Sequence, residues 1–440
     1  MAVRPGTCYY LTERADGMAL SGEWMNFRAI LRIAILTIAA TSGTALATSL
    51  HAAEPSVIQR GAQLAAVGDC IVCHTAKDGA PFAGGLPIHT PFGAIYSTNI
   101  TPDTETGIGS WTLDAFAQAM RRGKSSDDHL LYPAFPYVHF THMTDADIAS
   151  VYAFMMSRTP VRANAPANKL IFPLNFRPLL AVWNLLYLHA DTSEPMSRTQ
   201  DAQLDHGRYL VEGLGHCAAC HTPLNVFGAE KKDRAFDGAV IDGWDAPSLK
   251  TLLSAPTPWT REQLSTYLRT GLASEHGAAA GPMLPVTHSL ANASQADVEA
   301  MAAYIMSIQR SFPAAQAAPV KPAAGMQGGA IQAGATLFQA SCAACHAAHS
   351  PMNVVGGRPL LSQSTSVNSD SPRNVVRVLL DGLPAQGSTA RRIMPPFAGM
   401  LTDAQIADLA NYLRVQYSKQ PPWQLQADDV AKYRKETPTP

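Results

Sequence analysis

The sequence has almost no cysteine outside one kind of motif, and it has no excess of charge of either sign. Six of its seven cysteines lie in three Cys-x-x-Cys-His segments, and only Cys8 stands apart. The 33 basic and 34 acidic side chains balance, so charge gives no indication of a nucleic-acid partner. The chain also lacks a dinucleotide-binding glycine motif, a nucleophile constellation and a cluster of catalytic carboxylates, which argues against catalysis by its own side chains.

Long hydrophobic runs are also missing. The N-terminal apolar stretch, 33–40, is too short to span a bilayer as a permanent helix. It follows Arg28 and Arg32 and precedes small residues at 45–47, which is the pattern of a cleaved export signal. We therefore predict that residues 1–53 are a signal peptide with upstream sequence, and an uncleaved N-terminal anchor is the alternative.

The three motifs indicate covalently attached c-type haem. Two cysteines one helical turn apart can form thioethers to the two haem vinyl groups, and the adjacent histidine is then held against the iron. About 0.004 matches are expected by chance in such a composition. The predicted thioether anchors are Cys70, Cys73, Cys217, Cys220, Cys342 and Cys345, and the predicted proximal ligands are His74, His221 and His346.

Zinc and thiol redox chemistry fit the motifs less well. A structural zinc site needs four ligands close together, yet the motifs stand 147 and 125 residues apart and each has its own histidine. A thioredoxin-like motif would lie on a strand–helix unit, whereas the sequence around these motifs is helical in pattern.

Export is consistent with c-type haem, which is attached on the far side of the bacterial membrane. Met25 directly precedes the positive region of the signal, so we expect translation to begin there. Cys8 would then be absent from the protein. The predicted location is the periplasm.

The chain repeats one helical unit three times. Each unit has a short helix before its motif, a second helix ending at glycine, and a longer closing helix with apolar residues at helical spacing. Thr112 and Thr260 are predicted N-caps of the second helix, and Gly123, Gly271 and Gly382 end it. The closing helices contain Ile148, Tyr152 and Met155, then Val298, Met301 and Ile305, then Ile406, Leu409 and Leu413.

The predicted fold class is all-α, with three tandem cytochrome c-type domains. We place the first domain at 54–195, the second at 200–311 and the third at 330–420. An Ala/Pro/Gly-rich linker is expected at 312–329 and an extended tail at 421–440.

A haem iron in an electron carrier usually takes a sixth ligand, and methionine raises its potential. Twelve residues after Gly271 and Gly382 stand Met283 and Met394, which we predict as distal ligands. The same count from Gly123 reaches Phe135. The first domain therefore lacks a methionine where the other two have one.

Three interpretations of this gap stay open. Met143, just before the closing helix, is the first candidate for the distal ligand. His139 or His142 could ligate instead and give a bis-histidine haem of lower potential, or these histidines could be exposed loop residues. An open or weakly ligated iron is the third interpretation.

Two other features need an explanation. Met400, near Met394, is expected to be a core methionine. The stretch 172–188 is apolar on nearly every side, so it could lie on a membrane surface, face a quinone, or dock a partner subunit. Packing between the first two domains is the alternative.

The sequence resembles the triple-haem cytochrome c subunits of bacterial periplasmic, membrane-associated dehydrogenases, such as quinoprotein alcohol dehydrogenase and gluconate 2-dehydrogenase. The resemblance covers nearly all of the mature chain. It depends on the haem motifs together with Ser97-Thr98-Asn99-Ile100-Thr101-Pro102-Asp103, Gly107-Ile108-Gly109, Leu131-Tyr132-Pro133-Ala134-Phe135-Pro136-Tyr137 and the segment 172–177. Alcohol dehydrogenase members commonly have Met at the position of Phe135, and the Phe variant resembles subunits that serve molybdenum hydroxylases acting on aldehydes or N-heteroaromatic compounds.

The resemblance implies an electron relay with three covalently bound haem c groups. Its partners would be a catalytic dehydrogenase subunit, whether a quinoprotein, a flavoprotein or a molybdenum hydroxylase, and a membrane quinone or terminal oxidase as acceptor. The chain itself would then be an electron-transfer subunit that is not catalytic on its own. The alternatives are a self-contained haem enzyme with an open iron in the first domain, and a free-standing electron shuttle.

Overall fold

The computed structural model describes residues 54–189, 199–309, 328–347, 350, 360–384 and 394–436. All of them lie in one compact unit, Ala53–Pro440. The predicted signal, Cys8, Met25 and most of the predicted linker lie outside the described residues. No helix in the described ranges combines the length and apolar character needed to cross a bilayer.

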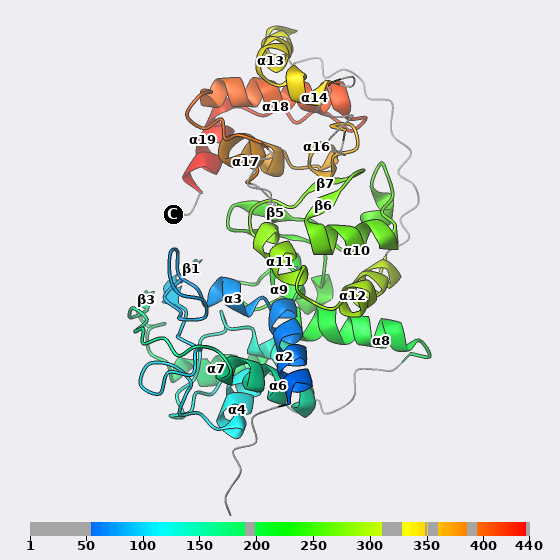
Figure 1. The fold of residues 1–440 in the computed structure, drawn as a ribbon. Helices are drawn as coiled ribbons and strands as arrows, with labels where there is room; N and C mark the ends of the chain where they lie inside the picture. Colours follow the sequence, from blue (N-terminus) through cyan, green and yellow to red (C-terminus); the bar gives the residue numbers. More distant parts are fainter. Residues whose placement is uncertain are drawn as a thin grey trace, which may run out of the picture. The chain divides into compact units, whose positions relative to one another are not determined.

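The first domain is mainly helical, with one small antiparallel sheet of strand order β1-β2-β3 (Figure 1). The β3 strand returns to the sheet from beyond the closing helix and pairs with β2. The elements are α2 (Pro55–Val67), α3 (Cys70–Cys73), β1 (Pro87–Thr90), β2 (Gly93–Tyr96), α4 (Leu113–Arg122), α5 (Tyr137–Phe140), α6 (Asp145–Met156), β3 (Lys169–Leu170) and α7 (Leu179–Tyr187).

The second domain repeats this order with two short hairpins in place of the sheet. Its helices are α8 (Ala202–Arg208), the π-helical turn η1 (Tyr209–Leu214), α9 (Ala218–His221), η2 (Lys232–Arg234), η3 (Leu252–Ser254), α10 (Arg261–Thr270), α11 (Met283–Leu290) and α12 (Gln295–Ser307). Its strands are β4 (Ala239–Ile241), β5 (Trp244–Ala246), β6 (Leu272–Ala273) and β7 (Gly277–Ala278).

The third domain is the smallest of the three. Its elements are α13 (Gly328–Ser341), α14 (Ala343–His346), α16 (Thr365–Asn368), α17 (Arg373–Asp381), α18 (Asp403–Tyr417) and α19 (Ala427–Lys435). The repeated order of opening helix, motif turn, second helix and closing helix confirms the all-α prediction, because the strands are few and short in the described ranges.

The predicted caps of the second helix are present. The hydroxyl of Thr112 accepts from the amide of Ala115, and Thr260 forms a capping box with Gln263. Gly123 and Gly271 end these helices in the left-handed region, with φ of 59° and 70°. Glycine is favoured there because it has no Cβ to approach the following carbonyl oxygen.

One glycine in each opening helix lets that helix cross the closing helix at backbone contact. A Cβ at Gly61 would lie 1.9 Å from the carbonyl oxygen of Ser150, and a Cβ at Gly207 would lie 2.0 Å from that of Ala300. At Gly334 the distance to the carbonyl oxygen of Asp408 would be 2.3 Å. Real side chains do not fit in such a space, so these glycines fix the helix crossing that carries each motif.

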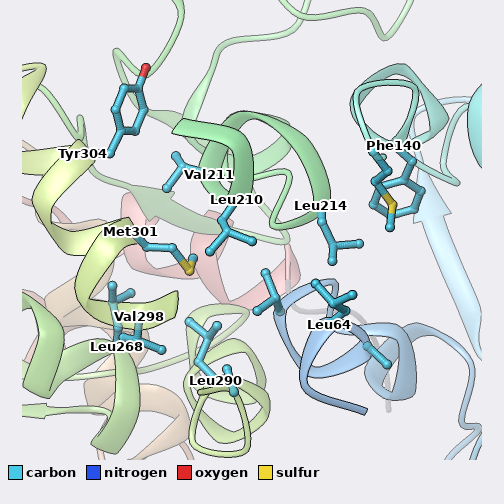
Figure 2. Close-up of a cluster of buried hydrophobic side chains, with 14 of the residues drawn as sticks. Leu64, Phe140, Leu210, Val211, Leu214, Leu268, Leu290, Val298, Met301 and Tyr304 are labelled. Carbon is cyan, nitrogen blue, oxygen red and sulfur yellow. The ribbon is translucent and has the colours of Figure 1, made fainter. Parts of the chain in front are cut away.

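The first and second domains share one hydrophobic core, which we call cluster 1. Figure 2 shows Leu64 of α2 in one group of side chains with Leu214 of η1 and Met301 of α12. All three side chains are at most 2% exposed. The third domain has its own core, cluster 2, which includes Phe338, Val376 and Ile406.

The expected extended tail is wrong for most of its length. After Pro421 and Pro422 the chain folds back, and Trp423, Leu425 and Val430 are buried in cluster 2. The amide of Leu425 donates to the side chain of Asn411, which fixes this return against α18. The prediction failed because α19 has few apolar residues, and the proline pair looks like the end of a domain.

The apolar stretch 172–188 has two sides. Phe172 and Leu185 are 86% and 82% exposed, and no residue of α7 is buried. The opposite side of α7 contacts the second domain, where Nε1 of Trp183 donates to the carbonyl of Phe227 at 3.1 Å. The alternative, packing between the first two domains, therefore holds for one side of α7.

Candidate haem-binding sites

The three motif turns share one backbone geometry. In each, the amide of the histidine donates to the carbonyl of the first cysteine, closing a single helical turn. The distances are 3.0 Å for His74 to Cys70, 3.0 Å for His221 to Cys217 and 2.9 Å for His346 to Cys342. One turn separates the two cysteines of each motif, so both thiols lie on the same face of the turn. All six thiols are free rather than joined in disulfides.

The chain reverses sharply before the first two motifs. Asp69 has φ of 51° and joins α2 to α3, and His216 has φ of 36° directly before Cys217. Such conformations are uncommon for residues other than glycine, and asparagine and aspartate tolerate them best.

In the first two sites a backbone carbonyl determines which ring nitrogen of the histidine carries the proton. Nδ1 of His74 lies 2.7 Å from the carbonyl oxygen of Thr98, and Nδ1 of His221 lies 2.7 Å from that of Pro247. A carbonyl oxygen only accepts, so Nδ1 must donate and Nε2 retains its lone pair. This is the arrangement that orients a histidine as a metal ligand through Nε2.

Electrostatics favour the uncharged forms of these groups. Desolvation lowers the pKa of His74 and of His221, and the hydrogen bond to the carbonyl opposes that effect only in part. A neutral imidazole is the form that binds a metal. Desolvation also raises the pKa of the Cys70 and Cys217 thiols to about 12, so they lack the thiolate character of redox-active cysteines.

The donor set fits covalent haem. Each described motif supplies two neighbouring thiols for thioether bonds and one histidine, and in two of them the ligand nitrogen is selected by a backbone carbonyl. Haem c supplies a one-electron redox couple when bound.

Met283 and Met394 lie in different local structures. Met283 begins α11 after the Gly281-Pro282 turn, whereas Met394 pairs with Leu383 in a bridge. Both side chains are half-buried and pack against a hydrophobic core. Phe135 is also half-buried, and its ring centroid lies 5.3 Å from that of Phe140.

The count of twelve residues does not correspond to one structural position. In the first domain the residue after Gly123 pairs with Leu130, which stands five residues before Phe135. In the second domain the residue after Gly271 pairs with Ala278, which stands five residues before Met283. In the third domain the same pairing is made by Met394 itself. The loop between the paired residues is thus five residues longer in the third domain, which sequence spacing alone could not reveal.

Met400 was expected in the core, and this expectation is wrong. Its side chain is 62% exposed, and its amide donates to the carbonyl of Phe397 at 2.9 Å. The amides of Phe135 and Met283 make the same three-residue turn with Tyr132 and Ala280. Met400 therefore corresponds to Met283 in its turn hydrogen bond. Met394 corresponds to Met283 in burial, because both side chains are half-buried.

Two of the predicted ligands for the first haem, Met143 and His142, differ in burial. Met143 is 2% exposed within cluster 1, and its carbonyl accepts from Nη2 of Arg121 at 2.7 Å. His142 is half-buried, and desolvation lowers its pKa.

His139 is buried rather than exposed, and both of its ring nitrogens are engaged. Nδ1 lies 2.9 Å from the carbonyl oxygen of Glu212, and Nε2 lies 2.6 Å from Oε1 of Glu230. Neither nitrogen is free for an iron, so the alternative of His139 as a ligand does not hold in this structure.

Sequence reasoning missed the groups that orient the histidines. Thr98 and Pro247 act through backbone carbonyls, which any residue provides, so no residue type marks them. It also missed Asp69, whose carboxylate accepts from the hydroxyl of Ser289 in the second domain. Burial raises the pKa of Asp69 to about 6 although that hydrogen bond opposes the shift.

Comparisons with known proteins define the class. A cytochrome c family model matches residues 58–159, 205–309 and 331–416, one match in each repeat. The chain therefore belongs to the cytochrome c family, with three cytochrome c domains and three covalently bound haem c groups.

Curated relatives narrow the resemblance. The chain is 37% identical over 404 residues to the gluconate 2-dehydrogenase cytochrome c subunit of Pantoea cypripedii. The alignment covers 87% of this chain and 91% of the relative. It is 36% identical over 403 residues to the cytochrome c subunit of alcohol dehydrogenase (quinone) of Gluconobacter oxydans. That alignment covers 87% of this chain and 83% of the relative. It is 45% identical over 381 residues to a nicotinate dehydrogenase subunit of Pseudomonas putida, covering 86% of this chain but spanning only 32% of that longer protein.

Proposed function

We propose that this chain is the electron-transfer subunit of a periplasmic dehydrogenase complex. Electrons from a catalytic partner would pass through its three haem c groups to a membrane quinone or a terminal oxidase. The proposal is supported by relatives that are cytochrome c subunits of dehydrogenases and are matched over most of their length. The predicted export signal and the exposed apolar side of α7 are consistent with a site at the outer face of the cytoplasmic membrane.

The residues have separate roles in this proposal. Each cysteine pair anchors one haem, and His74, His221 and His346 are the proximal ligands. Met283 and Met394 are the distal ligands of the second and third sites. The observation that carries the assignment is the hydrogen bond from Nδ1 to a backbone carbonyl, which leaves Nε2 of His74 and of His221 as the ligand atom.

The test is mass spectrometry of the native complex purified from membranes. We expect three haem masses on this chain and a large catalytic subunit as its main partner. Fewer than three haems would contradict the architecture. A chain that purifies alone from the soluble fraction with all its haems would instead support the free-standing shuttle.

For the first haem we propose Met143 as distal ligand. It directly precedes Thr144, the N-cap of α6, and lies inside cluster 1. Met143→Leu should remove one haem's share of the far-red Met-to-iron charge-transfer band of the oxidised protein. Met155→Leu, which changes another buried methionine of cluster 1, is the matched control and should leave the band intact. An unchanged band in Met143→Leu would exclude Met143.

We propose a molybdenum hydroxylase as the catalytic partner. Phe135 stands where alcohol dehydrogenase subunits commonly have methionine, and a nicotinate dehydrogenase subunit is among the relatives. The substrate would then be an aldehyde or an N-heteroaromatic compound. Metal analysis of the purified complex tests this: molybdenum supports it, whereas pyrroloquinoline quinone or flavin without molybdenum would assign the chain to a different partner.

A second candidate function follows from Phe135. If no side chain ligates the first iron, that haem could itself bind and activate a small ligand. A carbon monoxide difference spectrum of the reduced protein separates the two functions. Binding of one full equivalent would favour the self-contained haem enzyme, and binding of none would exclude it.

A further inference from the structure

The turn that carries Met283 is packed against one indole ring. Trp244, in β5, lies so close to the backbone of Gly281 that a Cβ at position 281 would be 2.4 Å from Cε2 of the indole. Gly281 has φ of 51°, so any other residue would be strained in this position. Two residues later the chain reaches Met283. The indole therefore limits where this turn can go on one side.

The same hairpin also fixes the proximal side of the second site. Strands β4 and β5 pair from Ala239↔Ala246 to Ile241↔Trp244. Directly after β5, the carbonyl of Pro247 accepts from Nδ1 of His221 at 2.7 Å. Pro247 thus contacts the proximal histidine, His221, and Trp244, three residues before Pro247, contacts the turn that carries Met283.

The third domain holds the indole from a second direction. The guanidinium of Arg377 in α17 lies 5.5 Å from the centroid of the Trp244 ring (Figure 1 shows α17 and β5). Arg377 is 2% exposed, its Nη2 pairs with Asp381 at 2.8 Å, and its Nη1 donates to the carbonyl of Tyr433 at 3.1 Å. A guanidinium anchored in this way has little freedom to move off the ring.

Hydrogen bonds to the backbone fix β5 to α17 as well. The amide of Asp245 donates to Oδ1 of Asn374, and Nδ2 of Asn374 donates to the carbonyl of Asp245, each at 2.9 Å. Nε of Arg373 lies 3.4 Å from the Asp245 carboxylate. The third domain therefore contacts both Trp244 and the strand that carries it.

We propose that Trp244 is a positioning residue that holds Met283 in place as distal ligand of the second haem, and that Arg377 of the third domain clamps it there. The ligation and potential of the second haem would then depend on the docking of the third domain. The inference rests on the proposed function, because it takes Met283 as that ligand.

The experiment uses the full-length chain with its haems attached. Its readouts are the far-red Met-to-iron charge-transfer band of the oxidised protein and a redox titration of all three haems. Trp244→Leu should lose one haem's share of the band and shift one of the three potentials downward, since methionine ligation raises the potential. Trp244→Phe keeps a flat ring against Gly281 and should retain the band.

Trp423→Phe is the matched control. Trp423 is also a tryptophan with an arginine over its ring, Arg414 at 4.6 Å, but it lies in cluster 2 and carries no contact to the Met283 turn among the described interactions. Its substitution should leave the band and the three potentials unchanged.

Met283→Ala distinguishes failure of the positioning role of Trp244 from failure of the assignment of Met283 as distal ligand. If Met283→Ala keeps the full band, Met283 is not a ligand and the proposed site is wrong. If Met283→Ala loses one share but Trp244→Leu matches the wild type, the positioning role is overturned. If Trp244→Leu fails to accumulate with three haems, Trp244→Met decides, because it keeps a large apolar side chain but removes the flat ring against Gly281: loss of one share supports the role, and a full band overturns it.

Discussion

Nε2 of His139 in the first domain lies 2.6 Å from Oε1 of Glu230 in the second. Burial by itself would lower the pKa of His139, but the hydrogen bond and charge of Glu230 and the carbonyl of Glu212 raise it on balance. A histidine that donates from both nitrogens to two acceptors is an imidazolium without a lone pair for iron. His139 therefore joins two domains and leaves the first haem to another ligand.

His139→Gln should consequently leave the haem spectra and the haem count unchanged while weakening the contact between the domains. We expect a loss of about 1–3 kcal/mol in the free energy of unfolding, since a buried partner is left without its hydrogen bond. Denaturant unfolding measures it. A loss of ligation at one haem, seen as a changed far-red band or a shifted potential, would show instead that His139 is a ligand.

The same pair gives a pH dependence of known sign. A histidine whose pKa is raised on folding above the ordinary 6.5 contributes stability that is present below pH 6.5 and is lost as the pH rises through the folded value. Unfolding free energy of the wild type should therefore fall on going to more alkaline pH, and His139→Gln should flatten that slope. An equal slope in both proteins would contradict the assignment.

Asp297 predicts the opposite behaviour in acid. Burial acts to raise its pKa, yet hydrogen bonds from His206 and Ser294 and the ion pair with Arg60 of the first domain hold the pKa at about 2. A depressed pKa contributes stability that is present above 3.8 and is lost as the pH falls toward 2. The carboxylate is 3% exposed, so this contribution is about 2 kcal/mol. Asp297→Asn should remove it, and acid titration of the unfolding free energy of both proteins would show a difference at neutral pH that shrinks as the pH falls below 3.8 and disappears below about pH 2.

Two glycines of one helix should respond oppositely to alanine. Gly334 faces the carbonyl of Asp408, whereas a Cβ at Gly329 meets nothing within 4 Å, and both lie in α13. Gly334→Ala should destabilise the third domain by about 1–3 kcal/mol through overpacking. Gly329→Ala should be neutral or stabilise it by up to about 1 kcal/mol through helix propensity. Thermal unfolding of the two variants compares them directly, and equal effects would refute the crossing contact.

Removing the third motif should leave the other two loaded. Cluster 2 is separate from cluster 1, so Cys342→Ala together with Cys345→Ala should reduce the haem mass from three groups to two without loss from the first two domains. Intact-mass measurement of the chain gives the count. Substitution of Cys8, which belongs to no motif, should change nothing, and any loss of haem there would place Cys8 in the mature protein.

The sequence determined the repeat, the haem chemistry and the caps. Cys-x-x-Cys-His forms one helical turn in each repeat, and Thr112 and Gly123 bound their helix through local hydrogen bonds and backbone conformation, which short-range rules describe. A glycine stands in the opening helix of each unit, at positions 61, 207 and 334, but the helix contact that requires it cannot be recognised from the sequence.

Only the tertiary structure decided which residues from distant segments meet. The carbonyls of Thr98 and Pro247 orient the histidines without any side-chain signal, and α19 is held in cluster 2 by a few apolar residues that do not stand out in a polar sequence. His139 and Glu230 are 91 residues apart, and Trp244 and Arg377 lie in different repeats. Local propensity specifies a turn or a cap because its atoms are neighbours in the chain, whereas the orientation of a ligand depends on packing between elements whose separation no local pattern encodes.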